Sequence, residues 1–213
     1  MRQSAVSFKS KDLELEGIIA QPEGETGPFP AVVICHPHPL HGGDMDNNVV
    51  FAVSYGLVAQ GVATLRFNFR GVGHSGGAHS NGELEHQDVL AAMDFMKAWP
   101  AVDHQKMGLA GYSFGAGVIL GYAGFARRAG VFAFIAPSLR ALESSPLKSN
   151  KQPKFVIVGD RDRLVESGQF PQVLESFLEP PACQIIAGAD HGWWGYESPL
   201  SQRVSQFFVE NLK

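Results

Sequence analysis

Cysteine, charge and long apolar runs are all scarce in this sequence, and each shortage argues against a class of protein. Its 213 residues include only two cysteines, Cys35 and Cys183. Each lies in an apolar run typical of a buried strand, so we expect two inert core thiols rather than a disulfide or a metal site. Charged residues make up 18% of the chain, which is low for a disordered protein.

Basic clusters and membrane-spanning segments are missing as well. The formal net charge is −4, and basic residues adjoin only in short pairs such as Arg127 and Arg128. The electrostatic footprint of a nucleic-acid-binding protein is therefore absent. No apolar run approaches the length that crosses a bilayer, and residues 1–10 lack the apolar core of a signal peptide. We expect a soluble, cytoplasmic protein that binds no nucleic acid.

Apolar residues are plentiful, at 45% of the chain, and they alternate between strand-like and helix-like patterns. Residues 6–18 have apolar positions spaced by twos around a turn, which predicts an antiparallel hairpin with one face in water. Later runs are short and continuous, as in parallel strands buried on both faces. They span residues 31–35, 63–69, 107–110, 131–135, 155–158 and 183–187.

Helices are expected between these runs, at residues 49–60, 83–99 and 113–124, with the end of another at 173–178, and a last helix at 199–212 closes the chain. Alternating strands and helices predict an α/β fold with a mostly parallel, doubly wound sheet after the N-terminal hairpin. At this length, we expect residues 1–213 to form a single domain. Residues 139–153 are polar, and we expect them to pass over the functional site. They are too few for a large lid.

The most informative motif is Gly-Tyr-Ser-Phe-Gly at residues 111–115. It follows a predicted strand and precedes a predicted helix, which is the context of a serine held at the tip of a strained turn. Glycines at both ends suit a turn that leaves no room for Cβ atoms near the helix and the neighbouring strand. The motif predicts that Ser113 is a nucleophile. The alternative is a structural Gly-Ser turn.

A serine hydroxyl is a weak nucleophile unless a base lies within hydrogen-bond reach and an acid orients that base. In a parallel α/β sheet, such partners are expected on loops at the carboxyl ends of strands. Asp160 and Asp162 follow the run at 155–158, and Asp190 and His191 follow the run at 183–187. We predict His191 as the base, against the alternative of a solvated loop histidine.

The order of these motifs resembles that of the α/β-hydrolase superfamily, and within it the small bacterial dienelactone-hydrolase-like serine esterases. The resemblance covers most of the chain and is carried by His-Pro-His-Pro-Leu-His-Gly-Gly at 36–43, Arg-Phe-Asn-Phe-Arg-Gly-Val-Gly-His-Ser at 66–75, and the motifs at 111–115, 159–162 and 188–191. It implies an α/β-hydrolase fold without a large lid. It also implies Asp162 as the acid, with Asp160 as the alternative and Asp190 shaping the loop.

An oxyanion hole needs two fixed N–H donors. One is expected from the amide of Phe114, the residue after the nucleophile. The other is expected from the loop after residue 35, where Pro37 and Pro39 have no N–H. Among positions 37–39 only His38 can donate, and the resemblance selects His38 as well. The alternative donor is the amide of Leu40.

Two other motifs suggest different chemistry. Gly-Val-Gly-His-Ser-Gly at 71–76 matches a dinucleotide fingerprint, but no helix begins directly after it and no acidic residue ends a second strand about 20 residues on. We interpret it as a turn that tucks in Arg70 and Ser75. His36, His38 and His41 resemble metal ligands, but the acid expected just before the third histidine is absent. We interpret His36 and His41 as holding the loop by hydrogen bonds, and we expect no metal and no cofactor.

These residues predict a serine hydrolase that cleaves esters or thioesters of small to medium acyl groups through an acyl-enzyme intermediate. A peptidase, another acyl-transfer enzyme or a non-catalytic binding scaffold are the alternatives, because fold alone does not decide function. Trp193 and Trp194 follow the base. They suit either a pocket wall or an aromatic plug that closes the edge of the domain.

Overall fold

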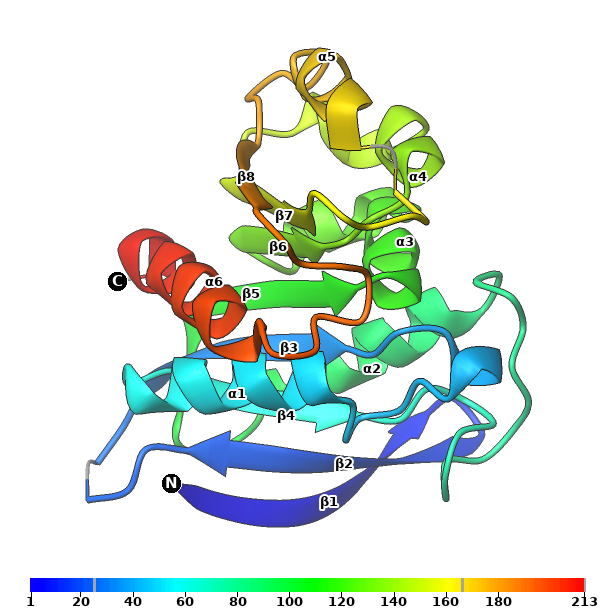
Figure 1. Cartoon of the computed structure of the whole chain (residues 1–213). Helices are drawn as coiled ribbons and strands as arrows, with labels where there is room; N and C mark the ends of the chain where they lie inside the picture. The colour runs from blue at the N-terminus through cyan, green and yellow to red at the C-terminus, as the bar shows by residue number, and fades with distance from the viewer. Residues whose placement is uncertain (25, 166, 213) are drawn as a thin grey trace.

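The computed structural model describes residues 1–24, 26–165 and 167–212 (Figure 1). Eight strands form one sheet in the order β1-β2-β4-β3-β5-β6-β7-β8. β1 pairs with β2 and β2 with β4 in antiparallel fashion, and all other pairs are parallel. The strands are β1 Arg2–Ser10, β2 Leu13–Gln21, β3 Phe29–Cys35, β4 Ala63–Phe67, β5 Val102–Tyr112, β6 Val131–Ile135, β7 Lys154–Gly159 and β8 Ala182–Ile186.

Helices cover both faces of this sheet. α1 and α6 lie together on one face, while α2 and α3 lie on the other (Figure 1). The helices are α1 Asn48–Ala59, α2 Glu85–Lys97, α3 Phe114–Leu120, α4 Leu139–Glu143, α5 Phe170–Leu174 and α6 Glu197–Leu212. Short 3₁₀ turns lie at η1 Pro39–His41, η2 Ala123–Arg127, η3 Pro146–Ser149 and η4 Ser167–Gln169. The predicted fold, a mostly parallel sheet with an antiparallel hairpin, is confirmed.

The core lies where the sheet is covered on both sides. Every residue of β4, β6 and β7 is buried, and so is nearly all of β3. β1 alternates between exposed and less exposed positions, as expected for a hairpin with one wet face. Apart from the last of them, the continuous apolar runs therefore mark strands that helices cover on both faces.

The last strand corrects one prediction. β8 is the final strand of the sheet, and all of its residues are exposed or half-exposed. Cys35 is buried as predicted, but Cys183 is exposed and is not a core thiol. An apolar run looks the same in sequence whether the strand lies inside a sheet or at its edge, because strand order depends on contacts distant along the chain.

Two of the helix boundaries that differ from the prediction lie near the functional site. The helix predicted over residues 113–124 ends at Leu120, because Gly121 caps it and Tyr122 has an extended backbone before the 3₁₀ turn η2. The final helix begins at Glu197, two residues earlier than predicted. Both changes affect the functional site, since the residues after α3 and the loop before α6 lie near it.

Candidate active site

The turn between β5 and α3 presents the predicted nucleophile. Ser113 has φ 51° and ψ −108°, a region that non-glycine residues rarely adopt. A Cβ at Gly111 would lie 2.6 Å from the Ala116 nitrogen, and one at Gly115 would lie 2.5 Å from the Cys35 carbonyl oxygen. The expectation that both glycines are needed for close packing is confirmed. The turn is fixed because α3 lies tightly against the end of β3.

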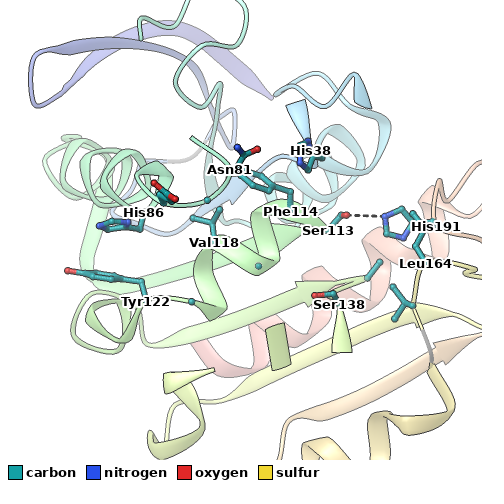
Figure 2. Close-up of a pocket in the computed structure, with 16 residues that line it drawn as sticks. His38, Asn81, His86, Ser113, Phe114, Val118, Tyr122, Ser138, Leu164 and His191 are labelled. Carbon is teal, nitrogen blue, oxygen red and sulfur yellow. Dashed lines mark hydrogen bonds between the residues drawn. The ribbon is translucent and has the colours of Figure 1, made fainter. Parts of the chain in front are cut away.

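The three predicted side chains converge although they are far apart in sequence. His191 Nε2 lies 3.0 Å from Ser113 Oγ, and His191 Nδ1 lies 2.7 Å from Asp162 Oδ2. Figure 2 shows the Ser113–His191 contact. The Asp162 side chain is fully buried, and its other oxygen accepts a hydrogen bond from the Leu164 amide. A carboxylate only accepts, so a neutral His191 carries its proton on Nδ1 and offers Nε2 as an acceptor to Ser113.

The other two acidic residues of these loops have different partners. Asp160 accepts a hydrogen bond from the Gly188 amide at 2.7 Å, which joins the loop after β7 to the loop after β8. Asp190 accepts from the amides of Gly192 and Trp193 at 3.0 and 3.1 Å. Asp190 therefore shapes its loop, as predicted. Of the three carboxylates, Asp162 is the one bonded to the His191 ring.

Tyr112 helps to hold His191 in position. Its hydroxyl donates a hydrogen bond to the His191 carbonyl oxygen, and the two rings lie 5.6 Å apart. Burial, and after it the charges of Asp162 and Asp190, raise the pKa of Tyr112 well above its ordinary value. The phenol therefore stays protonated and keeps its proton for this hydrogen bond.

The loop after β3 is fixed by His36. Its Nδ1 lies 2.7 Å from the Pro37 carbonyl oxygen, and its Nε2 accepts from the Phe69 amide at 3.1 Å. The ring is fully buried, and burial lowers the pKa of His36 to about 4. The structural role predicted for His36 is confirmed. His41 takes part through its backbone, whose amide donates to the His38 carbonyl oxygen at 3.0 Å, and its ring packs 5.0 Å from that of His38.

His38 lies between two prolines at the edge of the site. Its backbone has φ −62° and ψ 121°, and its ring packs 5.0 Å from the Phe114 ring. The alternative oxyanion donor, the Leu40 amide, already donates to His38 Nδ1 at 3.2 Å. Phe114 is the first residue of α3, so its N–H has no hydrogen-bond partner within the helix. These features favour the predicted pair of amides over Leu40.

A cavity of about 810 Å³ opens beside Ser113 and His191. It runs along α3, past Phe114 and Val118, to His86 and Tyr122 at the far end (Figure 2). The remaining lining residues come from the loops around it and from α3 itself: His38, Asn81, Gly82, Glu83, Gly117, Gly121, Ala136, Ser138, Leu164 and Val165.

The prediction that residues 139–153 pass over this site is wrong. None of the residues 139–153 lines the cavity, because α4 packs against α3 and α5 instead. The wall comes from the loop that precedes α2, which a buried carboxylate holds. Glu85 accepts from the Ser80 amide, the Ser80 hydroxyl and the Gly82 amide at 2.7, 2.6 and 2.9 Å. In the sequence, the one sign of this wall is an acid, Glu85, in the first turn of a predicted helix.

The two tryptophans have different environments. Trp193 is fully buried, whereas Trp194 is 74% exposed, and neither lines the cavity. Burial of Trp193 fits the plug interpretation. The Gly-Val-Gly-His-Ser-Gly turn also has a structural role, because the side chains of Arg70 and Ser75 are buried and bonded to Asp88 and to the Asn68 carbonyl.

Within the described residues, no group of three or more histidine, cysteine or acidic side chains is arranged to hold a metal ion. None of the helices in the described part of the chain combines the length and the apolar character needed to cross a membrane.

Comparison with known families agrees with the fold. Residues 1–165 match the model of a family described as esterase FrsA-like. The chain belongs to the FrsA-like esterase family. The matched region holds the β3 loop, the Ser113 turn and Asp162 of this esterase-family chain, while His191 lies beyond it.

Solved structures are similar to this chain over nearly its whole length. An alpha-beta serine hydrolase homologue from Coxiella burnetii is 30% identical, with a TM-score of 0.84 and 97% of each chain covered. XC6422 from Xanthomonas campestris, described as an a/b serine hydrolase without lid, is 27% identical, with a TM-score of 0.86 and coverage of 100% of this chain and 96% of that protein. The uncharacterized protein RP471 of Rickettsia prowazekii is 28% identical over 212 residues, which span 96% of this chain and 88% of that protein.

Proposed function

We propose that this FrsA-like chain is a serine hydrolase that cleaves carboxylic esters or thioesters of small to medium acyl groups. The observation that carries the proposal is the hydrogen-bonded chain from Ser113 Oγ through His191 to the buried carboxylate of Asp162. This chain stands at one end of a large cavity, so an acyl carbon placed in the cavity lies within reach of the serine oxygen. We expect the substrate to be a small molecule and the protein to be cytoplasmic.

The first half of the reaction forms an ester with the protein. Ser113 Oγ attacks the acyl carbon while His191 Nε2 takes the hydroxyl proton, and the carbonyl oxygen becomes an oxyanion. The amides of His38 and Phe114 supply the two donors for that oxyanion. The tetrahedral intermediate collapses, the bond to the leaving oxygen or sulfur breaks, and His191 gives its proton to that atom. Ser113 is left acylated.

Water then releases the acid. His191 Nε2 takes a proton from a water molecule, whose oxygen attacks the acyl carbon of the Ser113 ester. The second tetrahedral intermediate expels Ser113 Oγ, which recovers its proton from His191. Throughout, Asp162 accepts the hydrogen bond from His191 Nδ1 and stabilises the imidazolium while it exists. These steps use only side chains and amides of this chain, together with water.

The direct test is Ser113→Ala assayed beside the native protein. A fluorophosphonate probe should label the native protein and not the variant, and the variant should hydrolyse a reactive ester at least about 1,000-fold more slowly. Acyl esters, acyl-CoA thioesters and peptides in one panel separate esterase, thioesterase and peptidase activity. Full ester turnover by Ser113→Ala would contradict the proposal. No labelling of the native protein would favour a binding scaffold.

A further inference from the structure

The cavity has a direction, set by its two ends. Ser113 and His191 lie at one end, Phe114 and Val118 lie along the middle, and His86 and Tyr122 lie at the other end (Figure 2). We call the stretch from Phe114 to Tyr122 the α3 arm. It follows one side of α3 and of the two residues after it.

We propose that the α3 arm holds the acyl group of the substrate and that the His86–Tyr122 pair limits its length, which selects linear acyl groups of medium length. This inference rests on the proposed serine hydrolase function. It assigns a specificity role to residues outside the reacting group: Gly117 and Gly121 leave space for the acyl chain, and His86 and Tyr122 stop it.

The reaction itself decides which half of the substrate enters the arm. His191 must give its proton to the leaving atom, so the leaving group has to lie on the His191 side of Ser113. The α3 arm leads away from His191 (Figure 2). A second cavity, of about 570 Å³, adjoins His191 and Leu164 on the side of Arg161 and Arg163. The leaving group therefore has its own space, and the arm is left for the acyl group.

Gly117 is not explained by packing. A Cβ at Gly117 would meet no atom within 4 Å, whereas one at Gly111 or Gly115 would lie under 3.0 Å from neighbouring backbone. Gly117 is inside α3 and has no positive φ, and glycine within a helix is less favourable than alanine. What glycine leaves at this position is open space, and that space is part of the cavity.

Gly121, one turn further along, has the same character. A Cβ there would approach only the carbonyl oxygens of Gly117 and Val118, at 3.3 and 3.8 Å. Both belong to its own helix, so no other element needs to come close to this glycine. Two glycines four residues apart lie on the same side of a helix. Neither has a side chain that would enter the α3 arm.

The far end of the arm is a pair of stacked rings. The His86 and Tyr122 rings lie 4.7 Å apart at an interplanar angle of 26°, and the Phe125 ring supports Tyr122 from 5.1 Å. Gly121 is seven positions after Phe114, which corresponds to about 10 Å along a helix. An acetyl group would fill only the beginning of that length. A medium-length acyl chain would reach the rings.

The test measures kcat/KM for p-nitrophenyl acetate, octanoate and palmitate. Gly117→Leu places a side chain in the arm, and we expect the octanoate-to-acetate ratio to fall at least about 10-fold. His86→Ala removes one of the two stacked rings, and we expect the palmitate-to-octanoate ratio to rise by about 10-fold. The two variants therefore shift the preferred acyl length in opposite directions.

Gly130→Leu is the matched control. Gly130 is exposed, has no positive φ and lies outside the α3 arm, with only the Met107 oxygen at 3.8 Å from an added Cβ, so both ratios should match the native protein. Gly117→Leu should keep the native melting temperature or raise it, because leucine favours a helix. If Gly117→Leu is folded, is still labelled by a fluorophosphonate and keeps the native ratios, the acyl group does not lie in the α3 arm. The proposed serine hydrolase function would be unaffected by that result. No labelling of the native protein would overturn this inference together with the proposed function.

Discussion

Ser113 has a backbone conformation that costs free energy but places its hydroxyl for reaction. A non-glycine residue held at φ 51° costs on the order of 1–3 kcal/mol. Its amide donates to the Ile135 carbonyl oxygen at 2.8 Å, and its hydroxyl faces His191 Nε2. The strand beside β5 therefore holds the strained residue in place. At this scale, the position of one oxygen atom depends on close packing by glycines on either side of it.

The two carboxylates after β7 give the first prediction. Asp162→Asn replaces an acceptor by an amide that can donate to His191 Nδ1, which favours the wrong tautomer of the ring. We expect kcat for a reactive ester to fall by about 10⁴-fold, as in other enzymes with this arrangement. Near-native secondary structure by circular dichroism would show that the loss is not a loss of fold.

Asp160→Asn is the matched variant. Its remaining side-chain oxygen still accepts from the Gly188 amide, so we expect ester turnover within about threefold of native, since a surface substitution that keeps its hydrogen bond has a small effect. A larger loss for Asp160→Asn than for Asp162→Asn would reassign the acid to Asp160.

Among the elements, α2 does more than cover the sheet. Its first turn places Glu85 and Asp88 in the interior, where both are fully buried. Burial opposes the charge on Glu85, but hydrogen bonds from Ser80 and Gly82 outweigh it and lower the pKa of Glu85. Asp88 accepts from the Arg70 guanidinium at 2.7 and 2.9 Å and from the Ser10 hydroxyl at 2.7 Å. One helix turn thus joins the N-terminal hairpin, the loop after β4 and the cavity wall.

Removal of Asp88 should show how much stability this junction provides. Asp88→Ala leaves the Arg70 side chain, which is 7% exposed, without its carboxylate. Breaking a buried ion pair in this way costs about 3–5 kcal/mol, which urea unfolding would measure.

Arg128→Ala is the control for that measurement. It breaks the exposed pair between Arg128 and Asp94, and exposed pairs contribute less than about 1 kcal/mol. Equal losses in the two variants would mean that burial adds nothing to the Arg70–Asp88 pair.

Across the whole molecule, local patterns predicted what local geometry determines. The glycines around Ser113 indicated a tight turn because the close approach of α3 to β3 excludes a Cβ. Apolar runs indicated strands, and the parallel sheet brought the loops with Asp162 and His191 to one edge. The exposure of Cys183 could not be predicted, since edge position depends on contacts distant in sequence. The hydrogen bonds of Glu85 are local, but an acid in the first turn of a helix usually faces water, so its burial and the wall that it holds could not be predicted either.

The last prediction concerns the pH dependence of stability for the whole chain. Burial holds the pKa of His36 at about 4 in the folded protein, below the ordinary value of 6.5. The unfolded chain therefore binds a proton more readily, and the stability contributed by neutral His36 is complete above about pH 6.5 and is lost as the pH falls toward 4. Between about pH 7 and pH 5 this amounts to about 2 kcal/mol of unfolding free energy.

Urea unfolding at both pH values would measure that loss. His36→Gln has no titrating ring, so its unfolding free energy should fall about 2 kcal/mol less over this interval than that of the native protein. His104→Gln is the matched control, because His104 is an exposed histidine and its removal should keep the native pH dependence. The same fall in native and His36→Gln proteins would show that acid destabilises the fold through other groups. A difference of the expected size would identify the buried His36 imidazole as the group through which acid lowers the unfolding free energy in this interval.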